Sequence, residues 1–233
     1  MQLVLIPGFW LNGDSWNDVA APLREAGHTV HALTLPGLES ASADRSTIGL
    51  QDHVDAVVRF VDKLEGPVVL VGHSGGGSIA YAVADARPEV ITRIVFVDSG
   101  PLGDGGVIND ELPVVNGEIP LPNWDVFEEE DLVDLTDELR EHFRAISIPQ
   151  PARVASDKQS LTNEKRRDIP ATIICCEFSS IALRKWIDGG DPFVAEAGKL
   201  TDLELLDLPT GHWPQLTKPR ELAEMILKAV SRQ

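Results

Sequence analysis

Residues 68–80 read VVLVGHSGGGSIA, an apolar, valine-rich run followed by a cluster of glycines and then by small and apolar residues. The apolar run is typical of a buried strand, and the residues after the glycines predict a helix. Ser74 lies at the turn between them, within a G-x-S-x-G motif completed by Gly72 and Gly76. Such a turn strains the backbone of the serine, and the glycines remove side chains that would collide there. The motif therefore predicts that Ser74 is a nucleophile.

A glycine-rich turn between a strand and a helix can also bind phosphate. Residues 72–77 contain no G-K-[ST] ending and do not keep the G-x-G-x-x-G register of a dinucleotide site. A nucleophilic serine is therefore favoured over a nucleotide site.

Short apolar runs recur on both sides of this motif and alternate with amphipathic stretches. The predicted strands are residues 3–6, 30–34, 68–71, 94–97, 172–175 and 203–206, and the predicted helices are residues 16–26, 50–64, 78–86 and 219–230. Because parallel strands need crossover connections, this alternation predicts an α/β fold with a mostly parallel sheet and helices on both faces.

Residues 101–168 interrupt the alternation. The segment begins with Pro101 and several glycines, contains further prolines, and then has acidic stretches at 124–135 and 137–146 that predict helices. A structureless loop of this length is rare in a compact domain. We therefore expect a helical lid over the ends of the sheet, inserted into a core formed by residues 1–100 and 169–233.

The composition restricts the location and the partners of the chain. A length of 233 residues with 43% hydrophobic content predicts one main domain, and a net charge of −17 disfavours nucleic acids and anionic membranes as partners. No apolar window approaches the length of a membrane span, and the apolar start ends at Pro7 without a basic segment. We expect a cytoplasmic protein whose partner is a small-molecule substrate, while the oligomeric state stays open.

The cysteines do not predict a disulfide or a metal site. Cys175 and Cys176 are adjacent, so they point to opposite faces of their strand, and no C-x-x-C spacing or nearby histidine completes a ligand set. We expect neither a metal nor a cofactor.

His212 is the predicted general base. A serine hydroxyl needs an adjacent base at neutral pH, and this base is most often histidine. His212 follows the last predicted strand and precedes the C-terminal helix, in the order that a Ser-acid-His arrangement requires. The other histidines lie beside an early strand, on helical stretches or, for His73, within the motif itself.

The turn after the first strand supplies the predicted oxyanion hole. The backbone N–H groups of Phe9 and Gly75 are the natural pair to stabilise a tetrahedral oxyanion beside Ser74. The side chains of Trp10, His73 and Trp213 are the candidates for lining the substrate pocket.

With these motifs, the chain resembles the α/β-hydrolase superfamily over nearly its whole length. Within it, residues 3–16, 25–30, 35–37, 211–218 and 221–223 resemble the plant hydroxynitrile lyase and methylesterase branch. The resemblance implies a Ser-Asp-His triad and a helical cap. It also implies a lysine beside the catalytic histidine in the lyases, where this chain has Trp213, so ester hydrolysis is favoured over cyanohydrin cleavage.

The acid of the triad is not at the position that the resemblance implies. In most members it follows the strand at residues 172–176, at or near Ser179, where no aspartate is present. Asp98, at the end of the preceding strand, is the preferred substitute, because some branches, such as the haloalkane dehalogenases, carry their acid there. Glu177, Asp188 and Asp191 stay open as alternatives.

These residues together predict a serine hydrolase that cleaves a small to medium carboxylic ester or lactone through an acyl-enzyme on Ser74. Two alternatives use the same fold: a C–C bond lyase or hydrolase with the same triad, and a ligand sensor that does not turn over.

Overall fold

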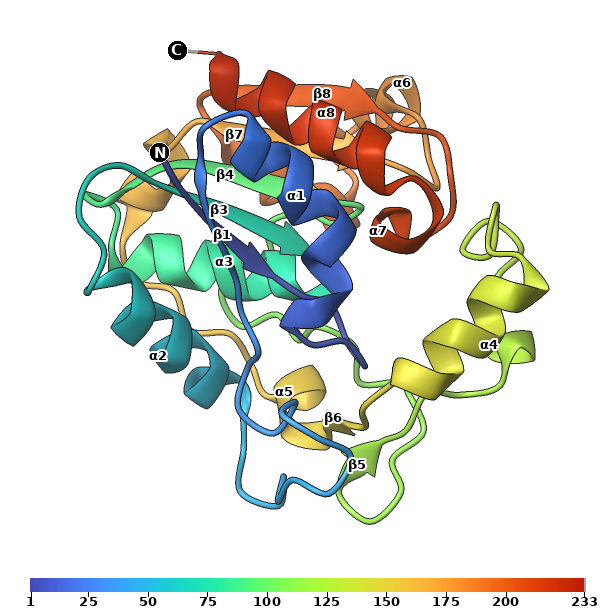
Figure 1. The fold of residues 1–233 in the computed structure, drawn as a ribbon. Helices are drawn as coiled ribbons and strands as arrows, with labels where there is room; N and C mark the ends of the chain where they lie inside the picture. Colours follow the sequence, from blue (N-terminus) through green and yellow to red (C-terminus); the bar gives the residue numbers. More distant parts are fainter. Residues whose placement is uncertain (233) are drawn as a thin grey trace.

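The computed structural model describes residues 1–232, and a six-stranded parallel sheet forms its centre (Figure 1). In spatial order the strands are β2 (Thr29–Ala32), β1 (Gln2–Ile6), β3 (Val68–His73), β4 (Ile91–Val97), β7 (Ala171–Cys175) and β8 (Leu203–Asp207). Each of the six predicted strands is confirmed, with small shifts at the ends.

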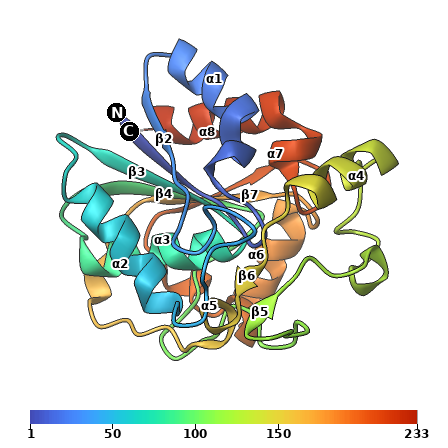
Figure 2. The ribbon, with the colours of Figure 1, turned by 60° about the horizontal axis from the view of Figure 1, so that its bottom comes forward.

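Alternating residues of each central strand point to opposite faces of the sheet, and both faces are buried. Leu3 and Leu5 of β1 pack on one face, whereas Val4 and Ile6 pack on the other. The first face is covered by α1 (Asn17–Glu25) and α8 (Pro219–Ser231), and the second by α2 (Leu50–Val61), α3 (Gly75–Ala86) and α6 (Ser180–Asp188), as Figures 1 and 2 show. The predicted α/β architecture is confirmed.

Five helices match the predicted ranges, including α4 (Asp137–Ile146) within residues 101–168, and several short elements were not predicted. The additional elements are α6, α7 (Pro214–Thr217), η1 (Gly13–Trp16), η4 (Pro192–Val194) and η5 (Ala197–Lys199). The apolar pattern of α6 is weak because Ile181 and Trp186 are exposed and only Leu183 is buried. No helix within residues 1–232 is long and apolar enough to cross a membrane.

Residues 101–168, called the insertion below, contain a two-stranded antiparallel sheet and short helices. These are β5 (Glu118–Ile119), β6 (Gln150–Pro151), η2 (Trp124–Val126), α4 (Asp137–Ile146), α5 (Ala152–Ser156) and η3 (Glu164–Asp168). The predicted helix at 124–135 is wrong beyond its first turn. The carboxylate of Asp131 accepts a hydrogen bond from the backbone of Glu128, and Asp134 has a positive φ of 63°, so this segment forms turns instead.

The insertion contacts the loops that follow the carboxyl ends of β1 and β8. The carbonyl of Trp10 accepts from the backbone N–H of Ile148, and the indole of Trp10 donates to the carbonyl of Ile119. On the other side, the backbone N–H of His212 donates to the carbonyl of Asp131 at 2.8 Å. The insertion therefore lies over the carboxyl ends of the strands, while its role as a lid stays a prediction.

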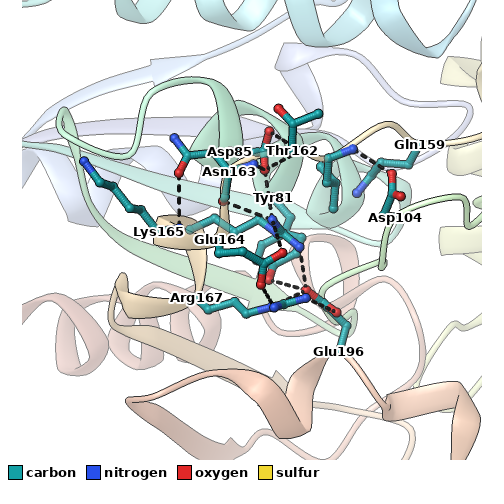
Figure 3. A network of polar contacts seen from close by, with 12 residues as sticks. Tyr81, Asp85, Asp104, Gln159, Thr162, Asn163, Glu164, Lys165, Arg167 and Glu196 are labelled. Carbon is teal, nitrogen blue, oxygen red and sulfur yellow. Dashed lines mark hydrogen bonds and ion pairs between the residues drawn. The ribbon is translucent and has the colours of Figure 1, made fainter.

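A buried ionic network connects the end of the insertion to α3 (Figure 3). The guanidinium of Arg166 is 1% exposed and donates to Asp85 of α3 and to Glu196, at 3.0 and 3.1 Å. Glu196 also accepts from the hydroxyl of Tyr81 and from Arg167. Burial alone would raise the pKa of Glu196, but its hydrogen bonds outweigh burial and lower this pKa to about 2. The network thus keeps Glu196 ionised.

We expect Arg166→Met to destabilise the fold strongly. The substitution leaves Asp85 and Glu196 buried without their shared cation, and breaking a buried pair in this way costs about 3–5 kcal/mol. Urea unfolding followed by circular dichroism measures the change. Lys165→Met is the matched control, because Lys165 pairs with Glu89 on the surface and its loss should leave the midpoint unchanged. Equal midpoints for the two variants would contradict this account of the network.

Candidate active site

Ser74 is held on a strained turn between β3 and α3. Its φ is 51°, its N–H donates to the carbonyl of Val97, and its carbonyl accepts from the hydroxyl of Ser99 at 2.7 Å. A side chain at Gly76 would place its Cβ 2.5 Å from the carbonyl oxygen of Ile6. The glycines of the motif are therefore required by close backbone approach, and the side chain of Ser74 is left partly exposed at the edge of the sheet.

His212 connects Ser74 to Asp98 through its two ring nitrogens. Its Nε2 lies 2.8 Å from the Oγ of Ser74, and its Nδ1 lies 2.7 Å from the Oδ2 of Asp98. The other oxygen of Asp98 accepts the backbone N–H groups of Cys176 and Glu177, at 2.9 and 3.2 Å. The structure thus places the three predicted residues Ser74, His212 and Asp98 in one hydrogen-bonded chain.

The other candidates for the acid occupy different positions. Asp188 is exposed at the end of α6, and Asp191 caps η4 by accepting from the backbone of Phe193. Ser179, where the family resemblance places the acid, is instead the N-cap of α6. Only Glu177 joins Asp98 at His212, because its Oε1 lies 2.8 Å from Nδ1.

The buried carboxylates change the proton affinities within this cluster. Burial alone would raise the pKa of Asp98, but its hydrogen bond to His212 and the charge of His212 hold this pKa below the ordinary value. Burial alone would lower the pKa of His212, but its hydrogen bond to Asp98 and the negative charges of Asp98 and Glu177 outweigh burial and raise this pKa. Burial raises the pKa of Glu177 to about 7. Shifts of opposite direction within one small cluster are typical of functional sites.

His73 supports the loop of His212 and does not line a pocket. It is fully buried, its Nε2 donates to the carbonyl of His212 at 2.6 Å, and its Nδ1 accepts from the side chain of Gln215. Burial and the nearby His212 lower the pKa of His73 to about 3, so the ring is neutral. The prediction that His73 is a pocket residue is therefore wrong, because no surface of its ring is left for a substrate.

The backbone N–H groups of Phe9 and Gly75 lie on the two turns that meet beside Ser74. A Cβ at Gly75 would lie 2.7 Å from the ring of Phe9, and a Cβ at Gly8 would lie 3.0 Å from that of Ser74. Gly75 is the first residue of α3, where backbone N–H groups have no partner within the helix. This proximity is compatible with an oxyanion hole, and its assignment to Phe9 and Gly75 stays a prediction.

Aromatic side chains from the insertion pack on Trp213, next to His212. The rings of Phe127 and Phe143 lie 5.2 and 5.1 Å from that of Trp213, and Phe127 also contacts Trp10. Trp213 is 1% exposed, so it lies buried within this aromatic cluster and does not form the wall of an open pocket. Trp10 and Trp213 were predicted from the sequence, whereas Phe127 and Phe143 were not, because only the folded insertion brings them next to Trp213.

The site could hold a metal ion only by giving up its hydrogen-bonded chain. Asp98, Glu177 and His212 are the group of potential ligands found within residues 1–232, with one ligand atom from each within 4.8 Å of the others. Coordination through Nδ1 requires loss of the proton that this nitrogen shares with Asp98.

An open cavity of about 640 Å³ lies away from the site, between α2, α3 and residues 157–163. It contains none of these side chains.

Comparisons with known proteins find a matching family and similar chains of the same fold. A family profile described as "Alpha/beta hydrolase family" matches residues 3–225. A carbendazim hydrolyzing esterase from Nocardioides sp. is 29% identical over 97% of this chain and 98% of its own length. An extracellular alpha/beta-hydrolase from a Paenibacillus species, described as sharing structural and functional homology with tobacco salicylic acid binding protein 2, superposes with a TM-score of 0.79 and 25% identity over 98% of both chains. A methylesterase from Arabidopsis shares the fold, with a TM-score of 0.78 and 17% identity over the whole of both chains.

We expect Gly8→Ala to slow the reaction of Ser74 with a fluorophosphonate probe by about 10- to 100-fold, since small misplacements at a site can cost this much. The added Cβ would lie 2.5 Å from the buried ring of His73, so the turn that carries Phe9 must move away from Ser74. Labelling rates measured by mass spectrometry check this. Gly103→Ala, whose Cβ would make only ordinary contact at 3.6 Å, is the control and should label at the wild-type rate. A Gly8→Ala variant that labels equally fast would show that this turn does not support the nucleophile.

Proposed function

The chain belongs to the alpha/beta hydrolase family, and from this premise we propose that it is a serine hydrolase that cleaves small to medium carboxylic esters or lactones. The observation that carries the proposal is the hydrogen-bonded chain from the Oγ of Ser74 through His212 to Asp98. Such a chain activates a hydroxyl for acyl transfer at neutral pH.

In the first half of the reaction, Nε2 of His212 takes the hydroxyl proton of Ser74 while Oγ attacks the ester carbonyl. The C–O bond to the alcohol then breaks, and His212 returns the proton to the leaving alcohol. The acyl group remains on Ser74. In the second half, His212 takes a proton from water as the water attacks the acyl-enzyme. The bond between the acyl carbon and Oγ then breaks, His212 returns the proton to the Oγ of Ser74, and the acid is released.

Asp98 supports both halves through the other ring nitrogen. Its Oδ2 fixes the tautomer that carries hydrogen on Nδ1 and leaves Nε2 free to accept a proton. The N–H groups of Phe9 and Gly75 would stabilise the oxyanion, an interaction that is typically worth several kcal/mol.

The aromatic cluster supports an apolar substrate. Phe127 is in edge contact with Trp10, and Trp10 with Phe9, whose ring lies against Gly75 beside Ser74. We infer that an apolar group of the substrate would bind on this side of Ser74. The related proteins include an esterase that hydrolyses carbendazim and a plant methylesterase. We therefore favour small esters with an apolar or aromatic group over long polar ones.

We expect the wild type to turn over short-chain p-nitrophenyl esters many times, with an initial burst of p-nitrophenol, and Ser74→Ala to lose this activity by a factor on the order of 10⁴ or more. Stopped-flow and steady-state absorbance measure the burst and the turnover. His212→Ala should lose the turnover to a similar extent.

Melting temperatures of the variants provide the folding control. A folded wild type that binds such esters and turns none over would contradict the esterase proposal and favour a ligand sensor. Cleavage of a β-diketone in place of every ester would favour the C–C hydrolase.

A further inference from the structure

Two carboxylates face the single N–H group of His212, the predicted general base. Nδ1 of His212 can carry one hydrogen, and it lies 2.7 Å from Asp98 and 2.8 Å from Glu177. Asp98 meets this N–H in line and forms the hydrogen bond, whereas the Oε1 of Glu177 lies off that line. Glu177 follows β7, and Asp98 follows the neighbouring strand β4. The two acids thus come from adjacent strands of the sheet.

Among the residues that the structure describes, the Oε1 atom of Glu177 has no other partner than this N–H, while the carboxyl group also lies beside that of Asp131. This Oε1 is buried and, within the described residues 1–232, has no hydrogen-bond partner by geometry. An unpaired buried acceptor is costly, so this oxygen either shares the proton of Nδ1 or carries a proton itself. The Glu177 side chain is 20% exposed, which leaves a route for exchange with solvent.

The charged groups around Glu177 are Asp98 from β4, Asp131 from the insertion and His212 from the loop after β8. The charge of Asp98 and a hydrogen bond with the carboxyl of Asp131 both raise the pKa of Glu177, whereas the imidazolium form of His212 favours its ionised form. Lys218, at the end of α7, is paired with Asp134. Protonation of Glu177 and protonation of His212 therefore exclude each other in part, because they respond to the same local charge.

We propose that Glu177 is a second carboxylate for the catalytic base, a positioning residue that shares the Nδ1–H of His212 with Asp98 and sets the pH at which His212 becomes free to accept the proton of Ser74. Its role as a support for catalysis rests on the proposed function. With the proton on Glu177, His212 is neutral and can act as base. With Glu177 ionised, two negative charges stabilise the imidazolium that forms when Oγ of Ser74 loses its proton to Nε2.

The pH profile of ester hydrolysis tests this role. Glu177→Gln removes one negative charge beside His212, so the pKa of the imidazolium falls. The acidic limb of the pH profile of kcat/KM therefore moves to lower pH, by about 1 to 3 pH units. KM should change little. Glu224→Gln, which removes the same charge from an exposed position on α8, is the control and should leave the limb in place. An unmoved limb in Glu177→Gln would overturn the proposal.

A second test asks whether Glu177 substitutes for Asp98. If it does, Asp98→Asn retains part of its activity because Glu177 still accepts the Nδ1–H. The double variant Asp98→Asn/Glu177→Gln then loses more activity than the product of the two single losses. Its loss approaches the value on the order of 10⁴-fold that is expected for a triad without its acid. If the losses simply multiply, Glu177 does not support the base. Glu177→Asp keeps the charge but shortens the side chain, so its activity should lie between that of the wild type and that of Glu177→Gln.

A readout independent of turnover separates this proposal from the proposed function. The ring resonances of His212, followed by nuclear magnetic resonance as pH is varied, should titrate at lower pH in Glu177→Gln than in the wild type and in Glu224→Gln. This shift in a protein that hydrolyses no ester would leave the carboxylate pair in place and reject only the esterase. An unchanged titration in Glu177→Gln would reject the pair even if the enzyme turns over.

Discussion

The backbone at Ser74 adopts a φ of 51°, a conformation that costs a non-glycine residue on the order of 1–3 kcal/mol and persists only where its surroundings enforce it. The carbonyl of Val97 and the hydroxyl of Ser99 hold this turn from β4 and from the loop that follows it. Close backbone contact with β1 at Gly76 fixes it from the other side. The site therefore depends on β1 and β4 lying on either side of β3, because each of these two neighbours restrains the nucleophile from its own side.

Residues with a positive φ also follow the two strands beside β3. Trp10, after β1, and Asp98, after β4, have φ values of 64° and 43°. Each of these turns redirects a group that the site uses: the backbone beside Phe9 in one case, and the carboxylate that reaches His212 in the other. Strain is thus concentrated at one edge of the sheet, while the buried strands and their covering helices carry the stability that offsets it.

The sequence allowed the sheet, Ser74 and His212 to be predicted because each has a local signal: apolar runs, a glycine-flanked serine, and a histidine after the last strand. The helix predicted at 124–135 failed because side-chain hydrogen bonding and a left-handed residue at Asp134 overrode its helical pattern. Glu177 could be named only as one alternative among several acids. The distance from Glu177 to His212 depends on the pairing of β7 with β8, and its closeness to Asp98 depends on the pairing of β4 with β7. No local pattern reveals either pairing.

The same strand pairing explains how a triad can lose its acid from one strand and keep its geometry. The ends of β4 and β7 are neighbours, so a carboxylate after either strand can reach Nδ1 of His212. Asp98 is held by two backbone N–H groups of the β7 turn, one of which belongs to Glu177 itself. Moving the backbone of either acid would therefore displace the other. The two carboxylates form one coupled unit around the histidine, and the proton that they share belongs to the unit more than to either residue.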